Sequence, residues 1–236
     1  MSRHRDRRNA APVTKPSVLC VYYTYTQQTL TVMEAMAGVF RDSDYDVTMA
    51  AIGYEEPRYS DRFASFPMPH PLRELLGVIP AQVRRRPATI RIPDEVTATS
   101  YDLVVVGAPT WWLSTDAPMR AFLGSDASTQ LLTDRPFAAA VCCRRYWRHN
   151  LKTVKRLGTA RGGEFLGGVH FRYDGGQVRS LLSLISYLGS GDYRERFAGV
   201  RIPRTNLQDH HLAEARTFAE GLVHRPLTTC QNVEDL

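Results

Sequence analysis

Two adjacent tryptophans, Trp111 and Trp112, follow a short apolar run in the middle of the chain and could form the aromatic wall of a binding site. The run covers residues 103–106, and its length and lack of charge are typical of a strand buried on both faces. Pro109 cannot continue a strand ladder, so we expect the chain to leave the sheet there and to present Thr110 and both indoles. The alternative is that one or both indoles cover the core.

A loop rich in hydroxyl and amide side chains follows the first predicted strand, residues 18–22. Its polar residues are Thr24, Thr26, Gln27, Gln28 and Thr29. A helix is expected over residues 29–41, because apolar residues recur there at spacings of three and four. The first N–H groups of a helix have no partner within it, so this loop would form an anion site. N-capping by Thr26 or Thr29 is the simpler alternative.

A third loop follows a predicted strand over residues 137–142. Its residues are Cys143, Arg144, Arg145, Tyr146 and Trp147, and a helix is expected to begin over residues 152–157. All three loops follow strands of a predicted parallel sheet, so they meet at its carboxyl edge, where open α/β folds bind ligands. The first loop offers donors for a phosphate, without the Lys and Gly of a nucleoside triphosphate loop, and the other two offer aromatic side chains.

These three motifs, in this order, resemble the flavodoxin-like superfamily, which includes FMN-binding flavodoxins and NAD(P)H:quinone oxidoreductase-like proteins. The hydroxyl-rich loop resembles the family's phosphate loop, T/S-x-T-G-x-T, through Thr24, Thr26 and Thr29. The segment GAPTWW is similar to the second flavin loop, and CCRRYW occupies the place of the third. The resemblance covers about residues 17–171 and returns in the last helix.

The resemblance implies an α/β fold with a doubly wound, parallel, five-stranded sheet covered by helices on both faces. It also implies FMN, with its phosphate on the first loop and its isoalloxazine ring between the other two. The cofactor-binding residues that it implies are Thr24, Thr26, Gln27, Gln28, Thr29, Pro109, Thr110, Trp111, Trp112, Cys143, Arg144, Arg145, Tyr146 and Trp147.

Two features depart from the family pattern. Gln27 stands where the family usually has glycine, so we expect a side chain over the phosphate loop. Arg144 and Arg145 stand where related proteins usually carry a Gly-rich turn, and positive charge beside the ring would stabilise the anionic reduced flavin and raise its potential. The alternative is that both arginines point into solvent.

Insertions are expected at two places. About fifty residues separate the second strand, residues 46–52, from the third, and within them an amphipathic helix is predicted over residues 71–79, ended by Pro80 and packed on the sheet. Contact with a membrane surface or a lipid-like substrate is the alternative. A second helical segment, residues 181–188, follows the fifth strand, residues 164–171, where a substrate or partner would approach the flavin. Packing of this segment between two copies in a homo-oligomer is equally compatible with its apolar spacing.

Length and composition suit one domain, since 236 residues with 43% hydrophobic content can bury one sizeable core. We expect this domain over residues 17–226, a disordered basic tail over residues 1–16 and a C-terminal tail over residues 227–236. The formal net charge is +6, and five basic residues against one aspartate give the first sixteen residues +4 of it, so we expect no nucleic-acid partner.

A cytoplasmic location is expected from three absences in the sequence. No run approaches the roughly 20 apolar residues that cross a bilayer, and the basic tail lacks the apolar segment of a secretory signal. The four cysteines, Cys20, Cys142, Cys143 and Cys230, form no C-x-x-C pair and suit a reducing compartment. The histidines show no metal-ligand spacing, so no metal is expected.

The function implied by the resemblance is an FMN-dependent oxidoreductase that transfers electrons or hydride from NAD(P)H to an organic acceptor such as a quinone. We assign no catalytic acid or base, because the cofactor carries the chemistry and the protein places it and tunes its potential. One alternative is a flavodoxin-type electron carrier that docks on a redox partner protein. Another is a flavodoxin-like scaffold that has lost FMN, which the departures at Gln27 and the arginine pair favour.

Overall fold

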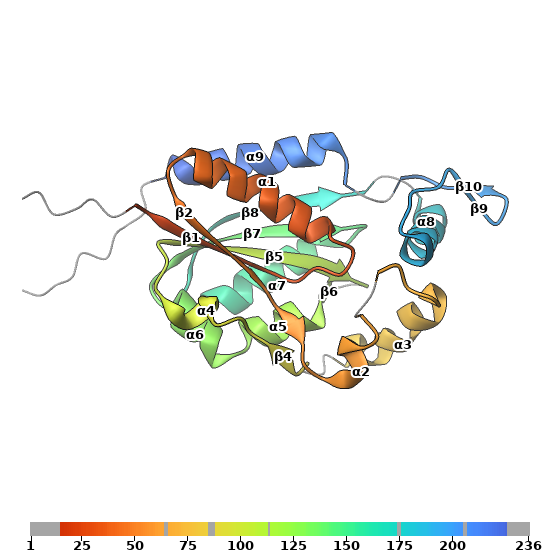
Figure 1. Cartoon of the computed structure of the whole chain (residues 1–236), viewed down its shortest axis with the longest axis horizontal. Helices are drawn as coiled ribbons and strands as arrows, with labels where there is room; N and C mark the ends of the chain where they lie inside the picture. Colours follow the sequence, from red (N-terminus) through yellow and green to blue (C-terminus); the bar gives the residue numbers. More distant parts are fainter. Residues whose placement is uncertain are drawn as a thin grey trace, which may run out of the picture.

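Five parallel strands form the central sheet in the order β2-β1-β5-β7-β8, with β6 added to the end of β5 (Figure 1). The five strands are β1 (Ser17–Tyr22), β2 (Asp46–Ala51), β5 (Leu103–Trp111), β7 (Pro136–Cys143) and β8 (Glu164–Arg172). The computed structural model describes residues 15–63, 66–84, 88–112, 114–173, 176–204 and 207–225. The tails predicted over residues 1–16 and 227–236 lie outside the described residues, except for Lys15 and Pro16.

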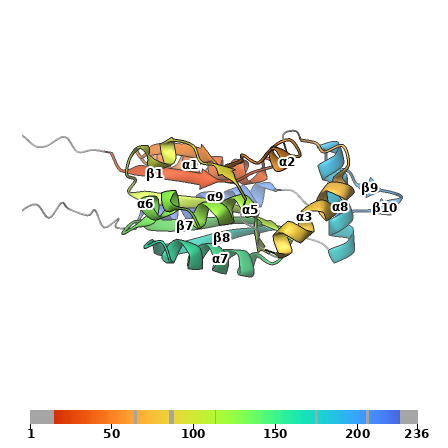
Figure 2. The ribbon, with the colours of Figure 1, turned by 90° about the horizontal axis from the view of Figure 1, so that it is seen from below.

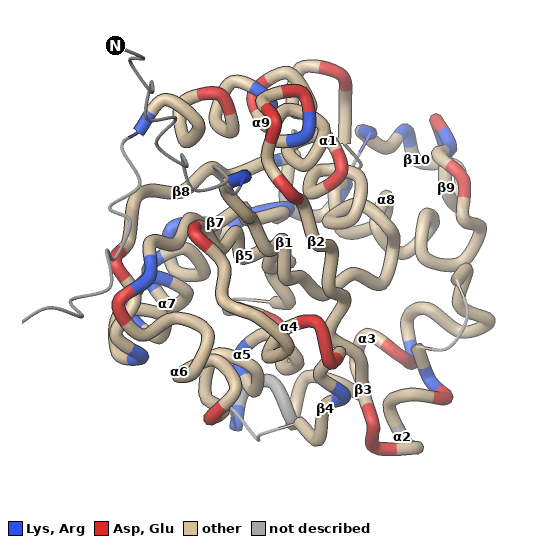
Figure 3. The backbone as a smooth tube through the Cα atoms, turned by 60° about the vertical axis from the view of Figure 1, so that its left-hand side comes forward, with Lys and Arg blue, Asp and Glu red and all other residues tan. Residues whose placement is uncertain are grey.

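Helices cover both faces of this sheet (Figure 2). One face packs against α1 (Gln28–Asp42) and α9 (Asp209–Val223), and the other against α5 (Ala117–Leu123), α6 (Asp126–Leu132) and α7 (Trp147–Thr159). Alternate residues of β1 enter the two layers: Cys20 packs with Met33 of α1, whereas Leu19 packs in the layer that contains Phe122. The central strands β1, β5 and β7 are buried on both faces, as their continuous apolar runs require, and they carry no charged residue (Figure 3).

The strand order defines the fold class. The chain runs from β1 outward to β2, then crosses to β5 on the other side of β1 and continues through β7 to β8. This is the flavodoxin-like doubly wound order, whose switch point lies between the first strand and the strand beside it, here β1 and β5. The predicted fold class is confirmed: the chain has a flavodoxin-like α/β fold.

The pairing of β5 with its parallel neighbours ends at Pro109, as predicted, but the strand itself continues to Trp111. Its last two residues pair with β6 (Ser114–Thr115) in an antiparallel hairpin. Pairing between β1 and β5 ends at Gly107, so the missing N–H of Pro109 falls where β1 has already ended. The Pro109 carbonyl on that side accepts a hydrogen bond from the Asp116 N–H at 3.3 Å.

The first insertion lies between β2 and β5. It contains β3 (Gly53–Tyr54), α2 (Pro57–Ser60), α3 (Pro71–Val83), β4 (Ile90–Arg91) and α4 (Glu95–Ala98). The prediction that Pro80 ends the helix is wrong, since α3 continues to Val83 and the Arg84 N–H still donates to the Pro80 carbonyl at 3.1 Å. A proline removes one hydrogen bond of a helix, and here that loss falls within its last turns, where α3 tolerates it.

The second insertion follows β8 and contains α8 (Gln177–Ser190), β9 (Arg196–Phe197) and β10 (Val200–Arg201). The prediction that the first insertion's helix packs on the sheet is wrong, because α3 packs against α8 beyond the carboxyl edge (Figures 1 and 2). The Met68 N–H, just before α3, donates to the Leu188 carbonyl of α8 at 2.7 Å. The two insertions therefore meet above the edge where the three loops lie. Within the part of the chain that the structure describes, no helix has the length and apolar character needed to cross a membrane.

Candidate functional site

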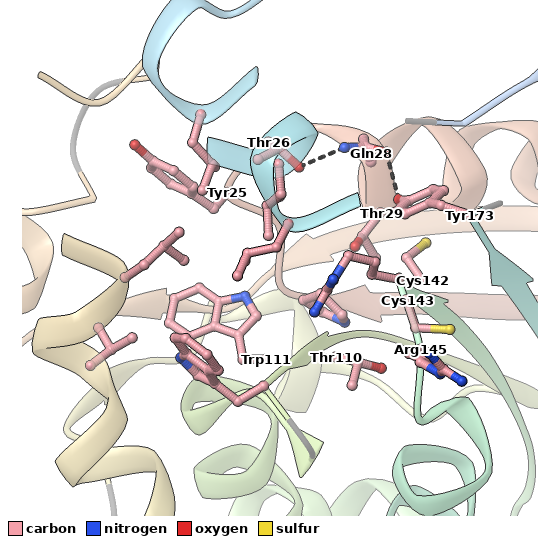
Figure 4. Close-up of a pocket in the computed structure, with 18 of the residues that line it drawn as sticks. Tyr25, Thr26, Gln28, Thr29, Thr110, Trp111, Cys142, Cys143, Arg145 and Tyr173 are labelled. Carbon is pink, nitrogen blue, oxygen red and sulfur yellow. Dashed lines mark hydrogen bonds between the residues drawn. The ribbon is translucent and has the colours of Figure 1, made fainter. Parts of the chain in front are cut away.

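A pocket opens at the carboxyl edge of the sheet, between the three strand-to-helix loops and the two insertions (Figure 4). It encloses about 160 Å³, and about 1080 Å³ when its open mouth is included. The enclosed volume is below the roughly 300–1,000 Å³ of ordinary small-molecule sites. A ligand larger than this volume would therefore extend from the enclosed part into the mouth.

Most of the predicted site residues line this pocket. Those that do are Thr26, Gln28, Thr29, Pro109, Thr110, Trp111, Trp112, Cys143, Arg144, Arg145 and Tyr146. Thr24, Gln27 and Trp147 do not line it. The structure thus brings together side chains from all three loops, as the parallel sheet requires.

The first loop ends at the N-terminus of α1, which has no side-chain cap. Gln27 occupies the N-cap position, and neither Thr26 nor Thr29 caps the helix. The first hydrogen bond of the helix runs from the Thr31 N–H to the Gln27 carbonyl at 2.9 Å. The N–H groups that precede Thr31 have no partner within the helix, and together with the positive end of the helix dipole they favour an anion.

A hydrogen-bond network fixes the side chains at this helix end (Figure 4). The Gln28 amide donates through Nε2 to Thr26 Oγ1 at 3.3 Å. Its Oε1 accepts from the Tyr173 hydroxyl at 2.5 Å and from the Leu207 N–H at 3.1 Å. Burial raises the pKa of Tyr173 well above its usual value, so the phenol keeps its proton and remains a donor. Because Thr26 accepts from Gln28, its own O–H is available to donate to a ligand.

Gln27 turns the chain in a conformation that normally selects glycine. Its φ is 63° and its ψ is −2°, which is the left-handed region. The Gln27 side chain is exposed and does not line the pocket. Thr24 also lies outside the lining, with a buried hydroxyl that has no partner among the described residues.

The second loop is held from behind by Asn150, a buried residue of α7. Its Nδ2 donates to Thr110 Oγ1 at 2.8 Å and to the Ala108 carbonyl at 3.3 Å. Its Oδ1 accepts from the Thr115 hydroxyl at 2.6 Å. The amide therefore ties the end of β5 to β6 and fixes the turn that carries the two indoles.

The two tryptophans have different surroundings. Trp111 packs against Tyr23 and Phe63, with ring centroids 5.6 and 5.1 Å away. Trp112 has a φ of 57°, and among the described residues no ring contact joins it to another aromatic side chain. A bulky residue held at positive φ costs of order 1–3 kcal/mol and is typical of ligand sites. Trp111 is therefore partly a core residue, whereas Trp112 is the indole that is free to stack on a ligand.

The third loop places two guanidinium groups at the pocket. Arg144 is half-buried and Arg145 is exposed. Burial lowers the pKa of Arg144 from its usual value, but an arginine stays protonated in proteins, so its charge faces the pocket. Tyr146 occupies the N-cap position of α7 at a φ of 62°, without a side-chain cap hydrogen bond, and is 42% exposed.

Trp147 belongs to α7 rather than to the loop, since the helix begins there and not over residues 152–157 as predicted. Its indole stacks on His170 of β8, with ring centroids 3.6 Å apart, so the side chain is committed to packing between α7 and the sheet. This contact explains why Trp147 does not line the pocket. Cys143, the last residue of β7, does line the pocket.

The cysteines of the pocket are not reactive thiolates. Burial raises the pKa of Cys142 to about 12, and a hydrogen bond with Thr29 only partly opposes this effect. Burial likewise raises the pKa of Cys143 to about 12. Both thiols are free and buried, and both remain protonated at neutral pH. Cys230 lies outside the described residues, and among the described residues no group of three or more His, Cys, Asp or Glu could hold a metal ion.

Sequence reasoning did not assign several residues that line the pocket. They are Tyr25, Phe63, Met68, Glu74, Leu75, Val78, Cys142, Tyr173, Leu181, Leu184 and Leu188. The leucine spacing of residues 181–188 did predict a helix after the fifth strand, and Leu181, Leu184 and Leu188 of that helix line the pocket. Tyr173 and Asn150 were missed because their hydrogen bonds reach residues 145 and 40 positions away in the sequence, which no local pattern records.

Solved structures similar to this chain include flavodoxins and flavoproteins. A flavodoxin from the domain Archaea is 11% identical, with 88% of this chain and 96% of that chain covered and a TM-score of 0.48. Oxidised flavodoxin 1 from Bacillus cereus is 13% identical, with 88% and 97% covered and a TM-score of 0.48. A flavoprotein in complex with FMN from Lactobacillus acidophilus NCFM is 15% identical, with 66% and 93% covered and a TM-score of 0.45. No protein-family model matches the sequence, and no curated protein sequence matches it. The fold class itself follows from the strand order.

Proposed function

We propose that this protein binds FMN in the carboxyl-edge pocket and transfers electrons from NAD(P)H to an organic acceptor such as a quinone. The observation that carries the proposal is the uncapped N-terminus of α1 with the Thr26 hydroxyl held beside it, in the same pocket as Trp112 and Arg144. This arrangement offers an anion site and an aromatic wall within one pocket. These are the two parts that a phosphate-bearing, ring-shaped cofactor requires.

The residues present fit the phosphate of FMN. Thr26 and the first N–H groups of α1 would hold it, and Gln28 would keep the Thr26 oxygen in place. Gln27 does not prevent this arrangement, because its backbone already has the left-handed conformation and its exposed side chain does not line the pocket. The fit supports retention of FMN over a scaffold that has lost it.

The other two loops would hold the ring. Asn150 fixes Thr110 and with it the turn that presents Trp112, so the indole is ready to stack without much loss of freedom. Arg144 places a positive charge at the pocket that would stabilise negative charge on a reduced ring. Arg145, which is exposed at the same loop, is placed to receive an anionic group of the incoming nicotinamide nucleotide.

When bound, FMN would supply the two-electron chemistry that links NAD(P)H to the acceptor. For a quinone, one NAD(P)H and one proton from solvent yield one NAD(P)⁺ and one hydroquinone. The protein's part is to orient the ring, exclude water from its buried face with Trp111 and Phe63, and set its potential.

The test is steady-state NAD(P)H oxidation by the protein with added FMN and a small uncharged benzoquinone. The proposal expects turnover that depends on both FMN and quinone and exceeds the rate of free FMN. An electron carrier would hold FMN but show no such turnover. Turnover no faster than that of free FMN would contradict the enzymatic proposal.

A further inference from the structure

One wall of the pocket is apolar and comes from the two insertions rather than from the three loops. We call this the apolar wall, and its residues are Met68, Leu75, Val78, Leu181, Leu184 and Leu188. The first three belong to α3 or the segment before it, and the last three lie on one face of α8 at spacings of three and four. The wall therefore exists only because this chain brings its two insertions together.

The two insertions are packed closely enough to form one surface. The Met68 N–H donates to the Leu188 carbonyl at 2.7 Å. A Cβ atom on Gly189 would lie 3.0 Å from the Pro71 ring, which shows how closely the start of α3 approaches the end of α8. Met68 and Leu188 are buried, whereas Leu184 is only partly buried and faces the pocket. Met68 and Leu188 are thus used in the contact between the two insertions, whereas Leu75, Leu181 and Leu184 leave apolar surface for a ligand.

The charges around the pocket are segregated. Glu74 is the only acidic residue among the described residues that line it, and it is paired with Arg62. The arginines at positions 144 and 145 lie on the third loop, which is not part of the apolar wall. A charged group placed against the apolar wall would lose its water without gaining a partner, which is strongly unfavourable. The wall therefore selects an uncharged, apolar group.

We infer that the apolar wall binds the alkyl substituent of the electron acceptor, so that the acceptor is an uncharged ring with an apolar chain rather than a small polar quinone. This inference rests on the proposed function for the identity of the acceptor. The alkyl chain of the acceptor lies between α3 and α8, and its ring lies beside the flavin. The burial of the alkyl chain against the apolar wall supplies the binding free energy.

The test uses redox-inert probes, 4-alkylphenols with one to six carbons in the chain, which are uncharged at neutral pH. Binding is measured by isothermal titration calorimetry on the protein with excess FMN. We expect the dissociation constant to fall about two- to fourfold per added methylene, because burying a CH₂ is worth about 0.8 kcal/mol. The same dependence should appear in KM for benzoquinones of matched chain length.

Neighbouring leucines of α3 provide a matched pair of variants. Leu75 lines the pocket, whereas Leu76 is 53% exposed and does not. Leu75→Gln should reduce the chain-length dependence to less than twofold per methylene, and Leu76→Gln should leave it unchanged. Leu184→Gln makes the same test from α8 if Leu75→Gln does not fold, as judged by circular dichroism.

The outcomes separate the two proposals. Phenol affinity that does not change with chain length, or equal losses in Leu75→Gln and Leu76→Gln, overturns the inference about the apolar wall, and shows that the wall contacts only the flavin or the core. Chain-dependent phenol binding without quinone reduction supports an apolar ligand site and contradicts the oxidoreductase proposal. Quinone reduction without chain-length dependence supports the enzyme and overturns the apolar wall alone.

Discussion

Removing the Thr26 hydroxyl from the first loop should weaken the binding of FMN much more than the binding of riboflavin. Thr26→Val keeps the shape of the side chain but deletes the O–H that is available to a phosphate. A hydrogen bond to a charged group is worth about 1.5–3 kcal/mol, so FMN affinity should fall about 10- to 150-fold. Riboflavin lacks the phosphate, so its affinity should change less than about threefold.

The structure indicates that the variant keeps its pocket. Gln28 loses an acceptor for its Nε2, but its Oε1 still accepts from Tyr173 and Leu207, so the amide remains fixed. The assay is a fluorescence titration of both flavins against wild type and variant.

Thr31→Val is the matched control. It deletes a hydroxyl on the same helix that donates to the Gln27 carbonyl at 2.9 Å and does not line the pocket. We expect this control to bind both flavins as wild type does. Equal losses of FMN and riboflavin in Thr26→Val, or a loss of the same size in the control, would refute the assignment of Thr26 to the phosphate.

Three further predictions concern the other two loops and Asp116, the N-cap residue of α5. Trp112→Leu should relieve the quenching of flavin fluorescence. Trp111→Leu should chiefly lower the midpoint temperature of thermal unfolding, because the Trp111 ring packs in the core. The opposite result would show that Trp111 stacks on the flavin and that Trp112 supports the core. Arg144→Gln combined with Arg145→Gln should lower the FMN reduction potential in a redox titration, and an unchanged potential would place both charges away from the ring. Burial raises the pKa of Asp116 to about 8, so the folded state keeps a proton that the unfolded state releases, and stability should fall as pH rises from about 4 to about 8. Relative to Asp116→Asn, which can still cap α5, the wild type should lose on the order of 1 kcal/mol per pH unit in this window by urea unfolding; a pH-independent difference would contradict the burial argument.

The sheet could be predicted from the sequence because a strand that is buried on both faces must be a continuous apolar run. The apolar runs of β1, β5 and β7 predicted three buried strands, and the polar or aromatic loops that follow them predicted a site at one edge of the sheet. The order of the strands followed from the resemblance to the flavodoxin-like superfamily. Helix α8 was also predictable, since its leucines recur at helical spacing. These patterns are local: the strands are apolar throughout because both of their faces are buried, and the helix is apolar on the one face that packs against the protein.

The features that could not be predicted depend on distant parts of the chain. The continuation of β5 past Pro109 depends on where β1 ends, and that is a matter of register between two strands. The contact of Trp147 with His170 depends on the packing of α7 on β8. The position of α3 against α8, rather than on the sheet, depends on both faces already being covered by other helices. In each case tertiary packing decided between alternatives that the local sequence allowed.

The most direct test of the account is the binding of FMN itself. Purified protein is incubated with excess FMN, free cofactor is removed by gel filtration, and the absorbance spectrum of the protein fraction is recorded. The account predicts one retained FMN per chain, with the visible flavin band perturbed by the tryptophan beside it. A protein fraction that carries no flavin, even after incubation at high FMN concentration, would contradict the central claim.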